Sequence, residues 1–404
     1  MTGKQRVQVA MERGVPDRVP VFCQLSVGHY FLHSGVRPFD VWFRSAGFAD
    51  ALVALQKRYD FDGILINLPG RDPDFEKHLD RIERKDDVKE TWVWWKNGNY
   101  TRIPDDDNPH YFMADGTRYF PTFEEVDPES LWYVEPWDLT DITYPYTWAF
   151  ASEPRPHDDF FPEFHTDTIR LVKEKVGDTV SIHSEIFSPF SQFLELLNYE
   201  HALMALLDDP GKSHAILDRL TSGAIDLGRK HAAEGVDAVL ISSAFAGAGL
   251  ISRDNYESFV LPYEARIVRE IQAAYPETKV YTHTCGAIGD RLDLMLRTGT
   301  NGIDTLDPPP LGTIELEDAC QQLNGRAFIK GNLDPVNSLL YGTKQQVREA
   351  VEQRMRIAKP GGGWILSSAC SVAPAVKPEL LEYMVEVGHE LGVYKESEQT
   401  SRIR

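Results

Sequence analysis

The chain has 404 residues, of which 42% are hydrophobic and 26% charged, which is enough to bury one large core. It carries 42 basic and 62 acidic residues, and the net charge of −20 disfavours nucleic acid and anionic membranes as partners. No apolar run is long enough to span a bilayer, and the first residues lack the apolar core of a signal peptide. We therefore expect a cytoplasmic protein that binds neither nucleic acid nor membrane.

Short apolar runs bounded by turn residues recur along the chain, as in strands that are buried on both faces. In chain order, these predicted strands span residues 18–24, 63–67, 179–183, 238–242, 279–283, 302–305, 326–330 and 363–367. Amphipathic patterns predict helices over residues 37–59, 166–174, 201–234, 254–274, 289–298, 314–323, 344–358 and 378–391. This alternation predicts an α/β fold, a (β/α)8 TIM barrel. A doubly wound sheet is the main alternative, but no GxGxxG turn follows any predicted strand.

The stretch from about residue 72 to residue 163 interrupts the alternation. Turn signals such as Asn97-Gly98 and Asp115-Gly116 predict β-hairpins in it. Its aromatic residues include Trp92, Trp94, Trp95, Tyr100, Tyr111, Phe112, Tyr119 and Phe120. We expect a single TIM-barrel domain over residues 1–404, with this aromatic-rich insertion between the second and third strands, above the barrel mouth. The insertion could form a satellite core or a substrate lid.

Polar residues at strand ends predict the active site, because TIM-barrel sites form at the C-terminal face. His283 and Cys285 leave the fifth predicted strand two residues apart, so their side chains point to the same side. Cys370 follows the eighth predicted strand and reaches the same mouth. One imidazole and two thiolates suit zinc, and three protein ligands leave a position free for substrate. The sequence thus predicts a zinc site with the ligands His283, Cys285 and Cys370.

Three further residues near strand ends are candidates for catalysis beside the metal, namely His183, Glu185 and Asp307. Each could move a proton or hydrogen-bond the substrate, and Glu185 or Asp307 could fill the fourth metal position. The alternative for these residues is a structural hydrogen bond, and buried cysteines often act as small hydrophobic residues. No residue stands out as the binding site of a further cofactor.

Several segments of the chain resemble the uroporphyrinogen decarboxylase superfamily. They are PDRVPV at residues 16–21, GVDAVLISSAFAG at 235–247, FVLPY at 259–263, HTCG at 283–286 and GNLDP at 331–335. The last of these, and the ISxxxYxxFVLPY block that starts at Ile251, are fairly specific to the superfamily. The resemblance runs in pieces over nearly the whole chain and implies the same barrel.

Departures from the decarboxylase pattern indicate a different branch of the superfamily. Decarboxylases carry a PVWxMRQAGRY segment whose arginines grip the propionates of a tetrapyrrole, and here Leu25 and His29 replace them. Ser243 replaces the aspartate of the FDSWAG segment, and Cys370 replaces a C-terminal histidine. An HxC motif with a distant cysteine is similar to the zinc-dependent branch that holds methylcobalamin:coenzyme M methyltransferases and corrinoid-dependent O-demethylases.

This resemblance implies a zinc-dependent methyltransferase whose cobalamin is carried by a separate corrinoid protein. We expect O-demethylation, in which the methyl ether of a methoxylated aromatic donates its methyl group to cobalt, because the aromatic insertion could stack the ring. Three alternatives stay open. They are methyl transfer from methylcobalamin to a thiol such as coenzyme M, uroporphyrinogen decarboxylation, and ligand binding by a non-catalytic zinc-containing barrel.

Overall fold

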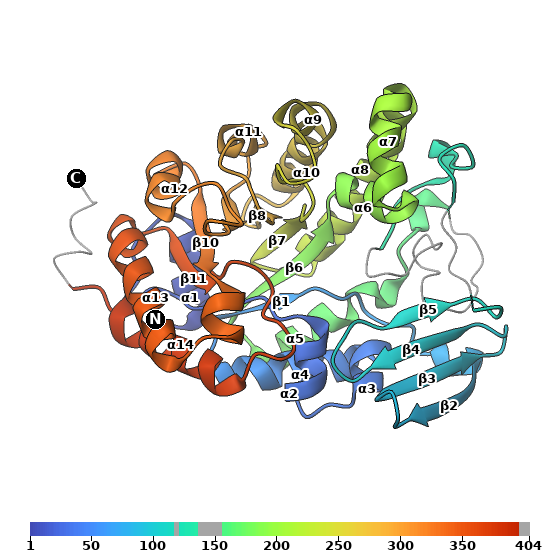
Figure 1. Ribbon diagram of the computed structural model, residues 1–404, viewed down its shortest axis with the longest axis horizontal. Helices are drawn as coiled ribbons and strands as arrows, with labels where there is room; N and C mark the ends of the chain where they lie inside the picture. Colours follow the sequence, from blue (N-terminus) through green and yellow to red (C-terminus); the bar gives the residue numbers. More distant parts are fainter. Residues whose placement is uncertain (117–120, 136–155, 396–404) are drawn as a thin grey trace.

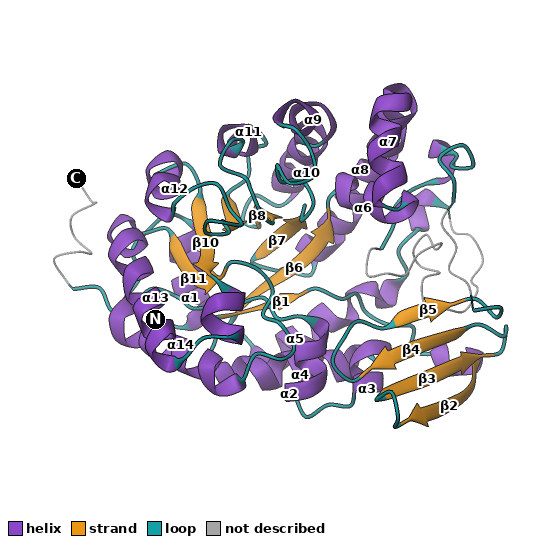
Figure 2. Ribbon diagram, viewed as in Figure 1, coloured by secondary structure: helices purple, strands orange, loops and turns teal. Residues whose placement is uncertain are grey.

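The computed structural model describes residues 1–116, 121–135 and 156–395. Its central sheet consists of parallel strands β1 Gly63–Ile66, β6 Ser181–Phe187, β7 Ala238–Ser242, β8 Lys279–Thr284, β9 Gly302–Thr305, β10 Phe328–Leu333 and β11 Trp364–Ser368. They pair in this order into one curled sheet, and helices cover its outer face (Figures 1 and 2). Most strand residues are buried, which explains why apolar residues dominate these runs. The predicted TIM-barrel class is confirmed.

The predicted strand over residues 18–24 is wrong as a regular strand. The segment forms isolated bridges, one of which pairs Val21 in parallel with Leu366 of β11. Pro20 has no N–H to donate, and the Val21 N–H donates to the Asp62 carboxylate, 2.8 Å away, instead of to a neighbouring backbone. The Val21 carbonyl accepts a hydrogen bond from the Asp62 N–H at 2.9 Å. The segment therefore lies between β11 and β1 and takes the eighth position in the barrel.

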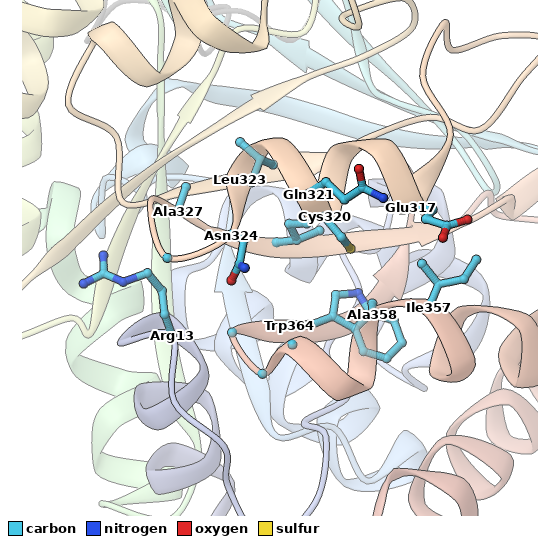
Figure 3. A pocket seen from close by; sticks show the side chains of 15 residues that line it. Arg13, Glu317, Cys320, Gln321, Leu323, Asn324, Ala327, Ile357, Ala358 and Trp364 are labelled. Atoms are coloured by element: carbon cyan, nitrogen blue, oxygen red, sulfur yellow. The ribbon is translucent and has the colours of Figure 1, made fainter. Parts of the chain in front are cut away.

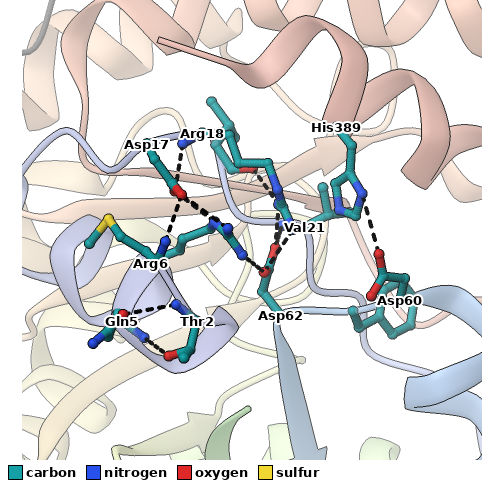
Figure 4. Close-up of polar contacts among 12 residues, drawn as sticks. Thr2, Gln5, Arg6, Asp17, Arg18, Val21, Asp60, Asp62 and His389 are labelled. Carbon is teal, nitrogen blue, oxygen red and sulfur yellow. Dashed lines mark hydrogen bonds and ion pairs between the residues drawn. The ribbon is translucent and has the colours of Figure 1, made fainter. Parts of the chain in front are cut away.

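A cluster of ion pairs holds this closing segment in place (Figure 4). The Asp62 side chain, only 3% exposed, accepts hydrogen bonds from Arg18 at 2.7 and 3.0 Å and from Arg6 at 3.2 Å. Arg6 also donates to both carboxylate oxygens of Asp17, at 2.6 and 3.0 Å. One buried carboxylate thus joins the closing segment, the N-terminal helix and the start of β1.

The helices are α1 Gly3–Met11, α2 Val27–His33, α3 Pro38–Phe43, α4 Ser45–Tyr59, α5 Asp167–Val176, α6 Pro189–Leu197, α7 Tyr199–Asp208, α8 Pro210–Ala233, α9 Arg253–Phe259, α10 Leu261–Ala274, α11 Leu292–Arg297, α12 Leu316–Leu323, α13 Lys344–Ala358 and α14 Pro378–Gly392. Short helical turns are η1 Phe75–His78, η2 Pro128–Ser130, η3 His157–Asp159, η4 Glu163–Thr166, η5 Pro335–Leu340 and η6 Lys359–Gly361. None of the helices in the described part of the chain is long and apolar enough to cross a membrane.

Three of the helices that the sequence predicts are each divided in two. The helix predicted over residues 201–234 breaks at Asp209, directly before Pro210, and that over 254–274 breaks at Val260, before Pro262. Proline starts a new helix readily but disfavours a helical residue before it, which explains the break at Asp209. Pro262 has no N–H to bond the carbonyl four residues earlier, which explains the break at Val260. The helix predicted over residues 37–59 breaks at Arg44, whose φ of −132° and ψ of 122° are extended.

The predicted insertion contains a four-stranded antiparallel sheet of β2 Leu79–Lys85, β3 Glu90–Trp95, β4 Tyr100–Pro104 and β5 His110–Phe112. It follows β1 and precedes β6, as the sequence predicts, and lies beside α3 (Figure 1). Tyr119, Phe120 and residues 136–155 of the insertion lie outside the described residues.

The aromatic side chains of this sheet lie on its two faces. On one face Trp95 is buried, and its ring centroid lies 5.2 Å from that of Phe43 in α3. On the other face Tyr100 stacks between Trp92 and Phe112, at 5.3 and 5.1 Å. Trp95 thus belongs to a satellite core that packs on α3, whereas Trp92, Tyr100 and Phe112 are only half-buried.

Candidate metal centre

The three predicted metal ligands come together at the C-terminal mouth of the barrel. His283 lies near the end of β8, Cys285 directly follows this strand, and Cys370 follows β11. The Nε2 atom of His283 lies 3.2 Å from the Cys285 sulfur, which lies 3.5 Å from the Cys370 sulfur. All three ligand atoms lie within 4.8 Å of one another, and this is the one such group among the described residues.

The chemistry of this donor set fits zinc. In a tetrahedral site with zinc–sulfur bonds near 2.3 Å, two sulfur atoms lie about 3.8 Å apart. The sulfur atoms of Cys285 and Cys370 are 3.5 Å apart, so only a small outward movement would seat the ion. No carboxylate belongs to this group among the described residues.

Residues of the neighbouring strand contact Nδ1 of the His283 ring, the nitrogen that faces away from the cysteines. Asp304 of β9 is the register partner of His283, and its Oδ2 atom lies 3.3 Å from Nδ1. The Thr305 hydroxyl lies 2.9 Å from the same nitrogen. Lys330 of β10, itself only 1% exposed, donates to both oxygens of Asp304 at 3.1 and 3.2 Å. These contacts leave Nε2 facing the cysteines, an arrangement typical of metal-binding histidines.

The three candidate ligands differ in whether they carry a proton when no metal is bound. A hydrogen bond from the Cys285 thiol, with help from His283, holds the pKa of Cys370 well below its usual range despite burial. The same hydrogen bond and burial raise the pKa of Cys285, so Cys285 keeps its proton. Burial lowers the pKa of His283, but Asp304 and Cys370 outweigh burial and raise it to about 10. The Cys370 thiolate therefore faces an imidazolium, and a bound dication would displace the protons from His283 and Cys285.

Asp307, a predicted catalytic residue, lies beside the metal ligands and holds their loop. Its Oδ2 atom accepts a hydrogen bond of 2.6 Å from the N–H of Gly286. Gly286 has a φ of 76°, a left-handed conformation that glycine adopts without strain, and this lets the chain turn directly after Cys285. Burial and the nearby Cys370 raise the pKa of Asp307 to about 6, against the hydrogen bond from Gly286.

Glu185, a second predicted catalytic residue, lies near the end of β6 at the same mouth. Burial raises its pKa to about 7, against a hydrogen bond from Ser242 and the charge of His283. Its Oε2 atom is buried and accepts no hydrogen bond from the residues that the structure describes. A carboxyl group with these properties can hold or release a proton near neutral pH.

His183, the third predicted catalytic residue, lies deeper in the barrel because β6 continues to Phe187, beyond the predicted strand end. Its Nδ1 atom lies 2.9 Å from the Tyr281 hydroxyl, and its Nε2 atom lies 3.1 Å from the Ser181 hydroxyl. Burial lowers its pKa to about 3. Both ring nitrogens are thus engaged within the core, which favours a packing role for His183.

Sequence reasoning missed a second buried carboxyl group, Glu135, which lines a small cavity together with Glu185. Burial raises its pKa to about 8. The single signal for it is a charged residue at the end of the apolar run Leu131–Val134, inside the insertion. The orienting role of Asp304 was missed as well, because it depends on the pairing of β8 with β9.

A separate hollow lies at the other end of the barrel (Figure 3). Arg13, Cys320 of α12 and Trp364 at the start of β11 line it, far along the strands from the metal ligands. Active sites of TIM barrels form at the opposite, C-terminal face. The hollow is therefore separate from the candidate metal centre.

The fold and the ligand group define an α/β barrel with a candidate metal centre of one nitrogen and two sulfur donors. The sequence model of the uroporphyrinogen decarboxylase (URO-D) family matches residues 145–391, and the chain belongs to this family.

Two curated relatives show how far the sequence similarity extends. The uroporphyrinogen decarboxylase of Ruthia magnifica subsp. Calyptogena magnifica is 27% identical over 233 residues, which cover 56% of this chain and 64% of that protein. The uroporphyrinogen decarboxylase of Alkalilimnicola ehrlichii is 27% identical over 246 residues, covering 59% of this chain and 64% of that protein. The chain thus matches slightly less than two thirds of the length of each relative.

Among solved structures, a methyltransferase from Methanosarcina mazei superposes with a TM-score of 0.68. The superposition covers 96% of this chain and 99% of that chain, at 17% sequence identity. The two proteins therefore share the same fold.

Proposed function

We propose that the protein is a zinc-dependent methyltransferase that demethylates the methyl ether of a methoxylated aromatic compound and methylates the cobalt of a corrinoid protein. The observation that carries the proposal is the convergence of His283, Cys285 and Cys370 at the barrel mouth, with ligand atoms within 4.8 Å of one another. The methyltransferase with the same fold supports it as well.

When bound, zinc would act as a Lewis acid that polarises the ether oxygen and stabilises the departing phenoxide. In the proposed transfer the bond between the methyl carbon and the oxygen breaks while a bond from the methyl carbon to cobalt forms. Cobalt(I) of the corrinoid protein supplies the electron pair of the new bond and becomes cobalt(III). The leaving oxygen gains one proton from the protein.

The residues around the centre have separate roles in this proposal. Asp304 and Lys330 orient His283, and Asp307 holds the turn that carries Cys285. Glu185 would deliver the proton to the leaving oxygen, because burial raises its pKa to about 7 and keeps it partly protonated at neutral pH. His183 would support the core of the barrel.

Two buried residues favour methyl transfer over decarboxylation of a tetrapyrrole. Leu25 and His29 stand where the decarboxylase pattern has arginines, and they are only 3% and 0% exposed. His29 is bound to the Tyr59 hydroxyl at 2.8 Å and the Ala373 carbonyl at 3.1 Å, and burial lowers its pKa to about 3. Neither side chain can supply a cation to a substrate with many carboxylates.

The test combines zinc-loaded protein, a reduced corrinoid protein and a panel of methoxylated aromatics, with cobalt methylation followed by absorbance. We expect methylation with the wild type and with Cys320→Ala, and a loss of at least about 100-fold with Cys370→Ala, which lacks a metal ligand. Glu185→Gln should keep zinc but slow the transfer, because it cannot release a proton.

Other outcomes would replace the proposal. Methyl transfer from methylcobalamin to coenzyme M, without ether cleavage, would reverse the direction and make a thiol the substrate. Zinc without any methyl transfer would favour a binding barrel. Activity on uroporphyrinogen would restore the decarboxylase interpretation.

A further inference from the structure

A small cavity, lined in part by Glu185, lies near the metal centre, close enough for the charge of His283 to act on Glu185. Elements far apart in sequence meet there: the end of β1, the end of β6, α5 and α8. Its polar lining consists of Asn67, Glu135, His165, Thr168, Glu185 and His231. It has room for about one water-sized guest, so it cannot hold an aromatic ring.

Four polar atoms that line this cavity have no hydrogen-bond partner among the described residues. They are Oδ1 of Asn67, Oε2 of Glu185, Oγ1 of Thr168 and Nδ1 of His231. All four side chains are at least nine-tenths buried. Leaving buried polar atoms unpaired costs roughly 1–3 kcal/mol each, so this many in one cavity indicates a guest that pairs with them.

The guest has to donate hydrogen bonds, because the lining consists mainly of acceptors. The amide oxygen of Asn67 and a carboxylate oxygen of Glu185 can only accept. Burial lowers the pKa of His231 to about 3, so its ring is neutral and Nδ1 can also accept. The Thr168 hydroxyl can accept as well.

The charges around the cavity favour a cation. Glu135 and Glu185 are both buried, and burial together with the charge of Glu185 raises the pKa of Glu135. The charge of Arg71 lowers the pKa of Glu135 but does not offset burial, and its Nε and Nη1 atoms donate to the backbone carbonyls of Trp42 and Pro69. A positive guest would compensate carboxylates whose charge is otherwise costly to bury.

We propose that this cavity binds one ammonium ion, held by Asn67, Glu185, Thr168 and His231 and balanced by the charge of Glu135. Potassium has a similar size, but the nitrogen acceptor of His231 favours ammonium, because hard cations prefer oxygen ligands. Occupancy would lower the pKa of Glu185 and thereby tune its proton transfer. That consequence rests on the proposed function, whereas the binding itself does not.

The test is thermal unfolding of the zinc-loaded protein in chloride salts of equal ionic strength, at a mildly alkaline pH at which Glu135 is ionised. Tetramethylammonium, which is too large for the cavity, serves as the reference cation. Ammonium should raise the unfolding temperature by about 1–3 °C in a saturable manner, and more than potassium or sodium. Glu135→Gln and Thr168→Val should each reduce the shift, whereas Glu174→Gln, an exposed residue on the same helix as Thr168, should keep it.

Three results would overturn the assignment. Equal unfolding temperatures of the wild type in ammonium and tetramethylammonium would show that the cavity holds water only. A larger shift with potassium would make potassium the ligand. A shift that persists in both Glu135→Gln and Thr168→Val would place the cation elsewhere. None of these measurements involves a corrinoid or a methyl donor, so they are independent of methyl transfer.

Discussion

The Asp304 carboxylate lies 3.3 Å from Nδ1 of His283, and the opposite ring nitrogen lies 3.2 Å from the Cys285 sulfur. The two residues are register partners on neighbouring strands, so the pairing of β8 with β9 fixes which nitrogen faces the metal position. Carboxylates in this position hold the ring and make the ligand nitrogen more basic.

We predict that Asp304→Asn weakens zinc affinity by about 10- to 100-fold, because the ring loses its charged partner. Competition with a chelator of known affinity measures the change. The same substitution leaves Lys330 buried without a counter-charge, which should lower the free energy of unfolding by about 3 kcal/mol.

The double variant Asp304→Asn with Lys330→Met separates these two effects. It removes the unpaired charge, so stability should recover in part while zinc affinity stays low. If zinc affinity recovers together with stability, Asp304 acts on folding alone and does not orient His283.

Zinc content should depend on Cys370 and be independent of Cys320. We expect about one zinc per chain in the wild type and in Cys320→Ala, and nearly none in Cys370→Ala, because two ligands hold zinc poorly. Plasma mass spectrometry of protein purified without chelators measures this. The Cys320 control lies on α12 at the other end of the barrel, so it tests for non-specific binding by thiols. A metal-free wild type would contradict the ligand assignment.

The free energy of unfolding should decrease as the pH rises from mildly acidic to mildly alkaline, because Glu135 loses its proton. Its pKa is about 8 in the folded protein, against 4.5 for the ordinary group. The folded state therefore binds the proton more tightly, and its stabilising effect is complete below pH 4.5 and lost as the pH rises to about 8. The loss is on the order of 4 kcal/mol when no small cation compensates the charge.

Denaturant unfolding at several pH values in tetramethylammonium buffer measures this dependence. Glu135→Gln should flatten the curve over that range, because the amide does not titrate. The exposed Glu174→Gln should leave it unchanged. An equally steep curve in Glu135→Gln would assign the titration to Glu185, because burial raises the pKa of that residue as well.

Substitution of Asp62, the central residue of the ion-pair cluster that closes the barrel, should destabilise the protein. We predict that Asp62→Asn lowers the free energy of unfolding by about 2–4 kcal/mol, because it weakens the contacts with Arg6 and Arg18 and the N–H of Val21. Chemical denaturation measures the change. Asp60→Asn is a matched control (Figure 4), since its side chain is 81% exposed and should alter stability by less than about 0.5 kcal/mol.

Sequence patterns alone predicted the fold class and three candidate metal ligands, which the folded chain brings within 4.8 Å of one another. Strands that are buried on both faces appear in the sequence as short apolar runs. For this reason seven of the eight predicted strands are present in the structure. The spacing of His283 and Cys285 was sufficient to place them on one side of a strand end. The place of Cys370 directly after the eighth predicted strand put it at the same barrel mouth, and the family resemblance agreed with this assignment.

Which side chains meet, and how far each strand extends, became visible in the folded chain alone. His183 entered the core because β6 continues to Phe187, and residues 18–24 became a bridged segment because Asp62 takes the Val21 N–H. Glu135 reaches the Glu185 cavity from a region 50 residues away, and Asp304 meets His283 through strand register. Local patterns report burial and periodicity, whereas register and packing between distant segments depend on the whole folded chain.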